Sequence, residues 1–386
     1  MKPNGELIPI MEIAAYYFPN YHLDARNEAR HGRGWTEWEL MKCARPRFER
    51  HDQPKIPLWG YEDEADPAVM AKKIAAAAKY GIDAFVFDWY WYDGPFLQRA
   101  LDEGFLGAEN CLEMKFALMW ANHDWMDRHP VGRQDAFHAP LLYPWNTTRQ
   151  NVAEVWQYLI DNYLTKPNYW TVGGLPYFSI YAVDRFIKQM GGPGEAAAVL
   201  AEFRGLARKA GLPGIHINAI WFDNLETTRS LACPPSEWVT KIGFSSYTSY
   251  NNVFTTPVWR QSFPRISCAE ACREYHELAD RAMKKLPAPY FPVVTAGWDS
   301  SPRTVQSEIY EFLDVYPYFP VMEPDPAALE NAIVELNALG PEAVFINAWN
   351  EWTEGSYIEP DEKNGFALLE AVSKAKRIIS EKEGAA

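Results

Sequence analysis

The chain has 386 residues, with 37 lysine and arginine side chains against 51 aspartate and glutamate side chains, so its formal net charge is −14. This excess of negative charge repels phosphate backbones and anionic lipid surfaces, which excludes nucleic acid as an expected partner. The length would allow two domains, but a barrel of alternating strands and helices can contain most of it, so we expect a single catalytic domain over residues 1–386.

Apolar runs of strand length alternate with helical patterns along the chain. The runs typical of buried strands are residues 11–18, 82–89, 114–120, 177–183, 216–221, 242–247, 291–298 and 343–346. Helices are predicted at residues 68–80, 149–163, 195–210, 268–286, 326–339 and 366–380. Eight strands alternating with helices predict an α/β fold, a (β/α)8 barrel of the TIM type with long loops after its strands.

A doubly wound open sheet is the alternative that shares this alternation. It would need a glycine-rich phosphate-binding turn after its first strand, and here that turn reads FPNYH, residues 18–22. The first strand is instead followed by a long polar loop, residues 20–67, and a loop of this length is usually functional.

The N-terminal sequence MKPNGELIPIM has one lysine and lacks the apolar run of about seven residues that a secretory signal peptide needs. No stretch approaches the roughly 18 apolar residues of a membrane span, so we expect no membrane insertion. The 5 cysteines are odd in number and scattered, which indicates reduced thiols. We expect a cytoplasmic protein, unless a leader has been removed, in which case it would be secreted or periplasmic.

The last predicted strand runs directly into a polar and aromatic segment, NAWNEWTEG, residues 347–355. A buried ionised carboxylate is costly unless it is paired or hydrogen-bonded, so Glu351 and Glu354 suggest a site. Strand carboxyl ends carry the catalytic groups of (β/α)8 barrels, and glycoside cleavage uses two carboxyl groups, one as general acid and one as base or nucleophile. The alternative is that both glutamates begin a solvated loop whose tryptophans only pack.

Polar and aromatic residues at the other strand ends would converge on the same face of a barrel. The chain's 16 Trp, 21 Tyr and 20 Phe suit sugar rings, which stack on aromatic planes, although an aromatic core would equally account for them. An ion pair between Asp299 and Arg303 that only orders their loop is likewise an equal alternative to sugar binding. Besides Glu351 and Glu354 as catalytic residues, the expected substrate-binding residues are Tyr17, His22, Glu37, Trp38, Asp88, Tyr90, Trp91, Trp120, Asn122, Asp124, Trp125, Tyr247, Trp298, Asp299, Arg303, Trp349 and Asn350.

Metal and nucleotide motifs are not found in the sequence. His123 and His129 lie in a proline-containing loop, and there is neither a His-Glu-x-x-His run nor a zinc-type cysteine spacing. No Gly-x-Ser-x-Gly nucleophile elbow, no Gly-x-x-x-x-Gly-Lys loop and no Asp-x-Asp triplet occurs either. We therefore expect no protein-bound metal and no cofactor. The glutamate pair and the aromatic residues described above favour an oligosaccharide or polysaccharide as the substrate.

Several segments, in this order, resemble the WbsX-like family, which is similar to glycoside hydrolase family 99, the endo-α-mannosidases and endo-α-mannanases. The segments are YYFPNYH (16–22), GRGWTEW (32–38), YGIDAFVFDWYWYDG (80–94), WANHDW (120–125), GLPYFSIY (174–181), GWDSSPR (297–303) and NAWNEWTEG (347–355). The resemblance implies a (β/α)8 barrel that acts on glycans and requires no metal.

The resemblance also implies roles for the two glutamates. Glu351 would deprotonate the sugar 2-hydroxyl, whose oxygen would attack C1 and form a 1,2-anhydro intermediate, with retention of configuration. Glu354 would protonate the leaving oxygen and later serve as the base for water. His123 stands where related sequences often have Glu, and Asp88 stands where a more aromatic or polar residue is common, which implies a pocket for a different sugar.

A retaining glycoside hydrolase is therefore the leading hypothesis. A glycosyltransferase that builds a surface polysaccharide is the second, because WbsX-like proteins are associated with polysaccharide gene clusters. A glycan-binding barrel without catalysis is the third.

Overall fold

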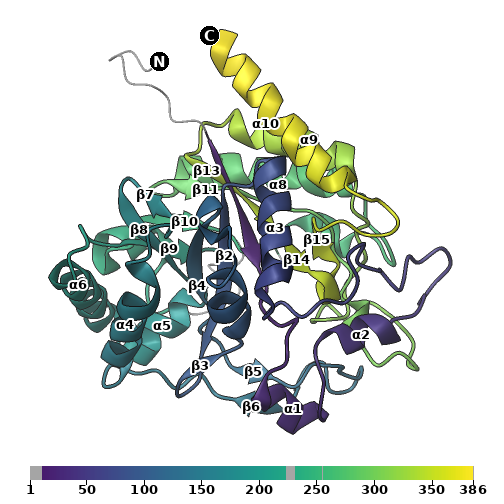
Figure 1. Cartoon of the computed structure of the whole chain (residues 1–386), viewed down its shortest axis with the longest axis horizontal. Helices are drawn as coiled ribbons and strands as arrows, with labels where there is room; N and C mark the ends of the chain where they lie inside the picture. Colours follow the sequence, from purple (N-terminus) through teal and green to yellow (C-terminus); the bar gives the residue numbers. More distant parts are fainter. Residues whose placement is uncertain (1–10, 223–230, 254, 386) are drawn as a thin grey trace.

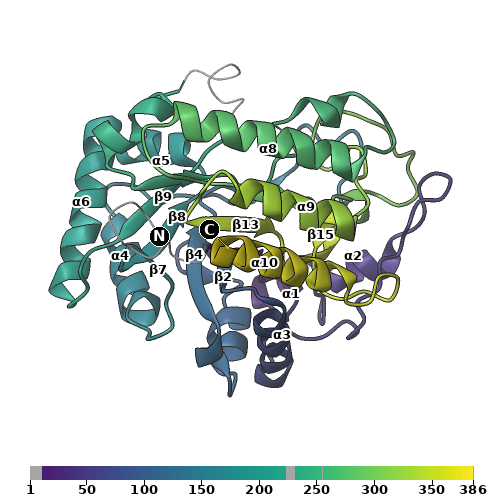
Figure 2. The same cartoon turned by 90° about the horizontal axis from the view of Figure 1, so that it is seen from above.

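The computed structural model describes residues 11–222, 231–253 and 255–385, so the N-terminal residues 1–10 considered above lie outside it. Figures 1 and 2 show a central parallel barrel covered by helices. Its strands are hydrogen-bonded in the order β11-β10-β9-β8-β4-β2-β1-β13-β12, which brings the last strand back beside the first. This nearly closed ring confirms the (β/α)8 architecture and excludes the open doubly wound sheet.

The barrel strands are β1 (Glu12–Tyr17), β2 (Ala84–Trp91), β4 (Lys115–Trp120), β8 (Leu175–Ile180), β9 (His216–Ile220), β10 (Ser246–Thr248), β11 (Tyr290–Phe291), β12 (Val293–Thr295) and β13 (Ala343–Asn347). β11 and β12 are halves of the predicted seventh strand, interrupted at Pro292, which has no N–H to donate. β11 pairs with β10, and β12 pairs with β13. The Pro292 carbonyl accepts from the Phe345 N–H at 2.8 Å, so the broken strand still closes the ring.

The helices that surround the barrel are α1 (Ala25–His31), α2 (Trp38–Cys43), α3 (Pro67–Tyr80), α4 (Val152–Leu159), α5 (Val183–Met190), α6 (Pro193–Lys209), α8 (Cys268–Lys285), α9 (Pro326–Asn337) and α10 (Ala367–Ala385). Every predicted helix is present, with its ends shifted. The short strands are β3 (Pro95–Phe96), β5 (Trp125–Met126), β6 (Leu141–Tyr143), β7 (Thr171–Val172), β14 (Asn350–Glu351) and β15 (Ser356–Tyr357).

Three local predictions need correction. The predicted loop at residues 20–67 contains α1 and α2, and the Asp24 side chain caps α1 by accepting from two backbone N–H groups. The fourth strand ends at Ile180 rather than 183, because α5 begins there and was not predicted. The sixth strand begins at Ser246 rather than 242, because a helical turn ends at Gly243 in the left-handed conformation, with φ of 93°.

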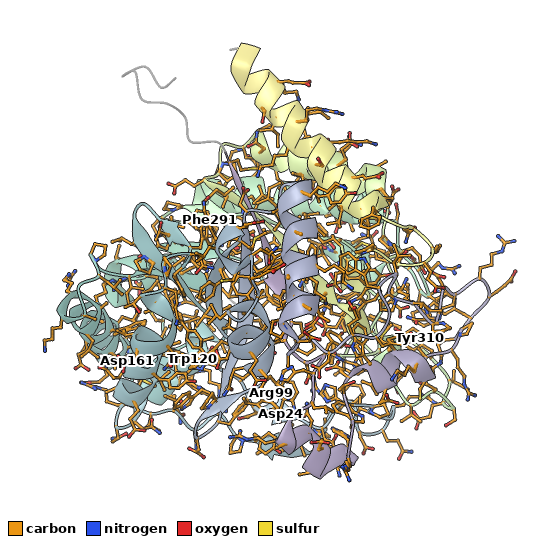
Figure 3. All side chains as sticks on the ribbon, viewed as in Figure 1. Asp24, Arg99, Trp120, Asp161, Phe291 and Tyr310 are labelled. Atoms are coloured by element: carbon orange, nitrogen blue, oxygen red, sulfur yellow. The ribbon has the colours of Figure 1, made fainter. Side chains whose placement is uncertain are left out.

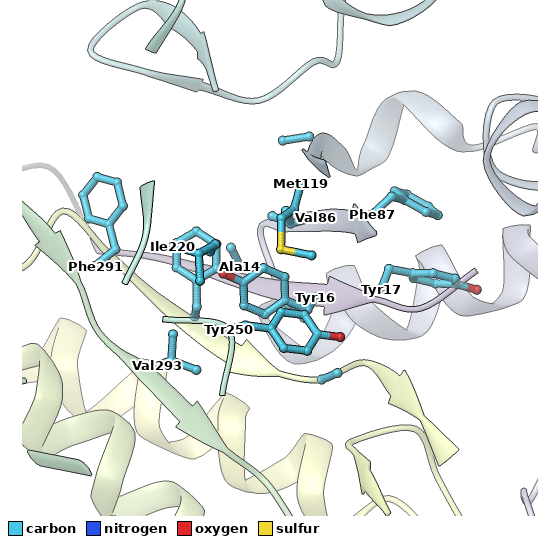
Figure 4. Packing of buried hydrophobic residues seen from close by; sticks show 14 of the residues in the cluster. Ala14, Tyr16, Tyr17, Val86, Phe87, Met119, Ile220, Tyr250, Phe291 and Val293 are labelled. Carbon is cyan, nitrogen blue, oxygen red and sulfur yellow. The ribbon is translucent and has the colours of Figure 1, made fainter. Parts of the chain in front are cut away.

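Side chains alternate between the inside and the outside of the barrel along each strand. On β1, Tyr16 points inward, where its ring lies 4.8 Å from that of Tyr250 (Figure 4). Tyr17 points outward, where it stacks on Phe87 at 4.5 Å and its hydroxyl contacts the sulfur of Met70 on α3. The buried core therefore has an inner and an outer layer, separated by the strands.

The 5 cysteines are all free. Within residues 11–222, 231–253 and 255–385, no helix is both long enough and apolar enough to cross a bilayer.

A buried ion cluster supports the segment that follows β13. Lys73 of α3, whose side chain is 3% exposed, lies 2.5 Å from Glu64 Oε1 and 2.6 Å from Glu359 Oε1. Glu64 in turn accepts from the Asn350 side chain at 3.0 Å, and Glu359 accepts from the Trp352 indole N–H at 2.7 Å. Asn350 and Trp352, the two residues that flank Glu351, are therefore each hydrogen-bonded to a buried carboxyl group. Lys73 contacts both of these carboxyl groups.

Replacing this lysine, Lys73→Met, should lower the free energy of unfolding by about 3 to 5 kcal/mol, because it leaves two buried carboxylates without their cation. Lys72→Met on the same helix is the matched control, since Lys72 is 38% exposed and its pair with Glu62 contributes at most about 1 kcal/mol. Urea denaturation followed by circular dichroism measures both variants. Equal losses would show that the cluster does not support the fold.

Candidate active site

A cleft of about 510 Å³ lies at the carboxyl ends of the barrel strands. Its walls come from β2, from the segments after β4 and β12, and from the turn after β13. The structure brings together in it the following residues predicted from sequence: Asp88, Tyr90, Asp124, Trp125, Trp298, Arg303, Glu351 and Glu354. Of the four residues predicted to share one cleft, Glu351, Glu354 and Trp298 line it, whereas Trp120 does not.

Arg303 lies at the base of the cleft and contacts three glutamates. Its Nε donates to Glu37 Oε1 at 2.8 Å, its Nη1 donates to Glu354 Oε1 at 2.7 Å, and its Nη2 lies 3.4 Å from Glu351 Oε2. Burial opposes the charged form, but the surrounding carboxylates outweigh it and raise the pKa of Arg303 well above its ordinary value. One guanidinium thus faces three carboxyl groups, so these four side chains together carry negative charge unless two of the carboxyl groups hold protons.

Glu351 and Glu354 differ in their surroundings. Burial raises the pKa of both. For Glu351, the charge of Glu354 adds to this rise, and Arg303 opposes it from the longer distance. For Glu354, the closer Arg303 guanidinium and the Tyr316 hydroxyl oppose the rise. In the free protein these contacts favour Glu351 over Glu354 as the residue that holds a proton.

A tyrosine hydroxyl connects Glu351 to a third carboxyl group. The Tyr250 hydroxyl lies 2.8 Å from Asp88 Oδ2 and 3.1 Å from Glu351 Oε1. A hydroxyl has one hydrogen to donate, so both contacts are satisfied when one of the two carboxyls is protonated and donates to the tyrosine oxygen. Burial raises the pKa of Asp88 well above its ordinary value, and Asp88 Oδ1 is buried without a hydrogen-bond partner among the described residues.

The turn that carries both glutamates depends on a glycine. β14 leads from Glu351 into a single 3₁₀ turn that ends at Glu354, and β15 returns antiparallel to it. Gly355 follows with φ of 63°, and a Cβ at this position would lie 2.6 Å from the backbone nitrogen of Asp299. The N–H of Asp299 donates to the Glu354 carbonyl at 2.5 Å. Only glycine allows this close approach between the segments after β12 and β13.

Two predicted acidic residues support the site from outside the cleft. Glu37 is fully buried and also accepts from Asn20 Nδ2 and Thr353 Oγ1, each at 2.5 Å. Burial would raise the pKa of Glu37, but Arg303 and the Thr353 hydroxyl lower it, so it remains ionised and anchors Arg303.

Asp299 is not paired with Arg303, so the proposed loop-ordering ion pair between them is wrong. Its Oδ2 lies 2.8 Å from His51 Nε2 and accepts from Gln53 Nε2 at 2.6 Å. Burial would raise the pKa of Asp299, but these neighbours, together with Lys55 and Ser301, lower it to about 2.

Four predicted aromatic residues lie outside the cleft because strand alternation directs them to the outer layer. Trp120, which was expected beside the glutamates, packs against Trp156 of α4 with a ring distance of 5.4 Å. Figure 3 shows Trp120 on the same side of the barrel as α4. Trp91 packs at 5.0 Å against Tyr158 of α4. Trp349 packs at 5.0 Å against Phe85 in the same outer layer as Tyr17. Their prediction as cleft residues is therefore wrong.

Five further predicted residues hold loops together rather than line the cleft. His22 is buried near Arg99, and burial lowers its pKa to about 4. The Trp38 ring packs against Tyr21, and its indole N–H donates to the Glu62 carbonyl. Asn122 is hydrogen-bonded to the backbone of Ala182, Asn350 is hydrogen-bonded to the backbone of Phe18, and Tyr247 donates to the Pro235 carbonyl. Each is a buried polar or aromatic side chain that satisfies local backbone or packing.

Cleft residues that sequence reasoning did not single out include Arg128, His129, Tyr250 and Tyr316. Tyr250 follows β10 by two residues, so the strand-end rule would have found it if that strand had been placed correctly. Tyr316 and Arg128 lie in long segments without periodicity, where no local pattern indicates that they reach the cleft. Within the described parts of the chain, no group of three or more His, Cys, Asp or Glu residues is arranged to hold a metal ion.

The chain is similar to known proteins in sequence and in fold. The family model described as "Glycosyltransferase WbsX" matches residues 13–372. Two curated proteins from Xanthomonas campestris pv. campestris strains, each described as "Uncharacterized protein WxcX", are 28% identical over 375 residues, which is 94% of this chain and 49% of theirs. The chain therefore spans about half the length of these relatives.

The chain is also similar to solved structures, at identities that show the fold alone. A family 99 endo-α-mannosidase from Bacteroides thetaiotaomicron has a TM-score of 0.56 at 14% identity and covers 97% of this chain and 99% of its own. A "Glycoside hydrolase-like protein" has a TM-score of 0.59 at 14% identity, covering 96% and 97%. A GH5_18 protein from Streptomyces cattleya, solved with GlcNAc, has a TM-score of 0.52 at 11% identity, covering 96% and 81%.

The buried aspartates Asp88 and Asp299 should affect stability in opposite directions. Asp88→Asn should raise the melting temperature relative to wild type, by an amount that grows as the pH rises above about 4, because the Asp88 carboxyl then ionises in the unfolded chain while burial keeps it protonated in the folded state, which favours unfolding. Asp299→Asn should lower the free energy of unfolding by about 2 kcal/mol near neutral pH, because the folded pKa of about 2 lies below the unfolded one.

The loss in Asp299→Asn should shrink as the pH falls from about 4 toward 2, where the wild-type carboxylate takes up its proton. Thermal melts of both variants between pH 4 and 8 and urea titrations at lower pH measure these trends. Shifts of the same sign at neutral pH, or no dependence on pH, would contradict the electrostatic description of the site.

Proposed function

This chain belongs to the WbsX glycosyltransferase family, and from that premise we propose that it acts on glycans as a retaining glycoside hydrolase with Glu351 and Glu354 as its catalytic carboxyl pair. The observation that carries the proposal is the pair of buried glutamates at the base of the cleft, joined by Arg303. A carboxyl group whose pKa is raised can hold a proton near neutral pH and donate it to a leaving oxygen, which glycoside cleavage requires.

Aromatic side chains in the cleft suit a sugar ligand. Tyr90, Trp125 and Trp298 line it beside the carboxyl groups. The C–H face of a pyranose can pack on such rings, while carboxyl and amide groups around them bind its hydroxyls. Asp88 Oδ1, buried and without a partner among the described residues, is suitable for a sugar hydroxyl.

The proposed reaction assigns one role to each glutamate. Glu351 removes the proton of the sugar 2-hydroxyl, and that oxygen attacks C1 while Glu354 protonates the departing oxygen. Water then attacks C1 with Glu354 as base, the C1–O2 bond breaks, and Glu351 returns its proton to O2, which restores both carboxyl groups and the original configuration. A 2-hydroxyl that donates to Glu351 favours its ionised form, so substrate binding shifts the shared proton from Glu351 to Glu354. This shift reconciles the proposed roles with the preference of the free protein.

A glycosyltransferase is the second candidate, and the description of the matched family favours it. A transferase must bind a sugar donor, commonly a nucleotide sugar, in the same cleft. A nucleotide sugar at a hundred times its dissociation constant would stabilise such an enzyme by about 2.7 kcal/mol. Thermal melts with a panel of nucleotide sugars, and mass spectrometry of products from a panel of glycans without nucleotide, therefore separate the two activities.

The two glutamates should respond differently to substitution. Glu354→Gln should slow substrates with basic leaving groups by about a hundred to ten thousand fold and spare those with good leaving groups, because only basic leaving oxygens need protonation. Glu351→Gln should be slow on both, because the 2-hydroxyl must be activated whatever group departs. Steady-state kinetics on an aryl glycoside and an oligosaccharide of the same sugar provide the measurement. Equal and mild effects on both substrates would remove these residues from the mechanism.

Activity should not depend on a divalent metal, because the proposed proton transfers use only carboxyl groups. Dialysis against EDTA should leave the turnover of the same oligosaccharide unchanged. Loss of turnover that zinc, calcium or magnesium restores would contradict the proposed chemistry.

A further inference from the structure

Arg128 differs from the other cations of the cleft in having no anionic partner. It lines the cleft in the segment after β5, and its guanidinium carbon lies 5.4 Å from the centre of the Tyr316 ring. Its Nε is buried without a hydrogen-bond partner, and no described carboxylate forms an ion pair with it. A guanidinium in this position has donors that no described side chain uses.

The other basic groups of the cleft are either paired or neutral. Arg303 is bound to glutamates, and Arg185 Nη2 lies 2.6 Å from Asp124 Oδ1. Burial lowers the pKa of His123, and it lowers that of His129 to about 4, so both are neutral near pH 7. The carboxylate adjacent in sequence to Arg128, Asp127, is already bound by Arg30. Arg128 is therefore a charged group of the cleft that has no carboxylate within ion-pair distance among the described residues.

Arg128 lies next to the side chains that hold the proposed catalytic glutamates. Its planar group lies over the ring of Tyr316, and the Tyr316 hydroxyl contacts Arg303 Nη1. The same Nη1 donates to Glu354. Arg128 is thus separated by one aromatic ring from the guanidinium that joins the two glutamates, within the same cleft that would hold a glycan.

The surrounding charge makes this position selective. With a net charge of −14 and several carboxyl groups at its base, the protein repels anions from most of the cleft. An arginine fork matches the oxygens of a carboxylate or a phosphate in a bidentate manner, and such charge-assisted bonds are stronger than bonds to neutral hydroxyls. A neutral glycan would leave these donors to water.

We propose that Arg128 forms an anion subsite, which binds a carboxylate or phosphate group carried by the glycan next to the catalytic pair. The glycan would therefore be acidic, carrying either an acidic sugar such as a uronate or a phosphorylated sugar. That this glycan is also the substrate rests on the proposed function, whereas its binding through Arg128 does not.

Binding to matched pairs of oligosaccharides tests this subsite. One set contains uronate oligosaccharides and the same molecules after reduction of their carboxyl groups, and the other contains phosphorylated oligosaccharides and their dephosphorylated forms. Isothermal titration calorimetry should show that the wild-type chain binds the acidic member of at least one set about ten to a hundred times more tightly, as expected for a charged hydrogen bond. Preference for the uronates or for the phosphates identifies the group that Arg128 binds.

Three variants assign the preference to this residue. Arg128→Gln should abolish it, and Arg128→Lys should retain part of it, because lysine keeps the charge but not the fork. Arg273→Gln is the control with the same loss of charge on the exposed surface of α8, and it should bind as wild type does. All variants should melt within a few degrees of the wild type, because Arg128 makes no ion pair with any described side chain, its contact with the Tyr316 ring contributes about 1 kcal/mol, and the pair of Arg273 with Glu270 is exposed.

An acidic preference that survives Arg128→Gln, or no preference in the wild type for either acidic set, would overturn the inference. Two further results would separate the anion subsite from the proposed hydrolase activity. Arg128-dependent binding with no hydrolysis of any bound glycan would leave the subsite in place and remove the hydrolase. Hydrolysis that depends on Glu354 but is indifferent to glycan charge would do the reverse.

Discussion

The site depends on one buried guanidinium. Arg303 comes from the segment after β12, Glu37 from the segment after β1, and Glu351 and Glu354 from the turn after β13. Without Arg303, these carboxyl groups could not be buried together, because an unpaired buried charge costs several kcal/mol. Even with Arg303 in place, one guanidinium cannot balance the charge of all three glutamates if every one of them is ionised. Burial raises the pKa of Glu351 and Glu354 despite Arg303, and a raised carboxyl pKa is the property that acid catalysis needs.

Packing and a second buried ion cluster hold the turn that carries Glu351 and Glu354 in place. Lys73, Glu64 and Glu359 fix the residues on either side of Glu351, and Gly355 lets the Glu354 carbonyl approach Asp299. The catalytic candidates are therefore carried by a short, fully supported turn at a strand end. Such rigidity is what a site for proton transfer requires, because small displacements of the carboxyl groups would weaken it.

The sequence predicted the barrel well because buried strands and capped helices leave local patterns. It predicted the cleft only partly. On β2, Asp88 and Tyr90 point into the cleft while Trp91 points outward, yet a strand buried on both faces reads as one continuous apolar run with no signal for direction. Tyr316 and Arg128 reach the cleft from irregular segments, where position depends on tertiary contacts rather than on any periodicity. Glu351 and Glu354 could be found because their chemistry is unusual at a strand end.

The central claim is that a glycan binds with its scissile bond at the glutamate pair. A crystal structure of the Glu354→Gln variant, soaked with an oligosaccharide that the wild type cleaves, tests it most directly. We predict a glycosidic oxygen within about 2.6 to 3.2 Å of the side chain at position 354 and a sugar 2-hydroxyl at the same distance from Glu351. Sugar bound with its glycosidic oxygen away from both residues would contradict it.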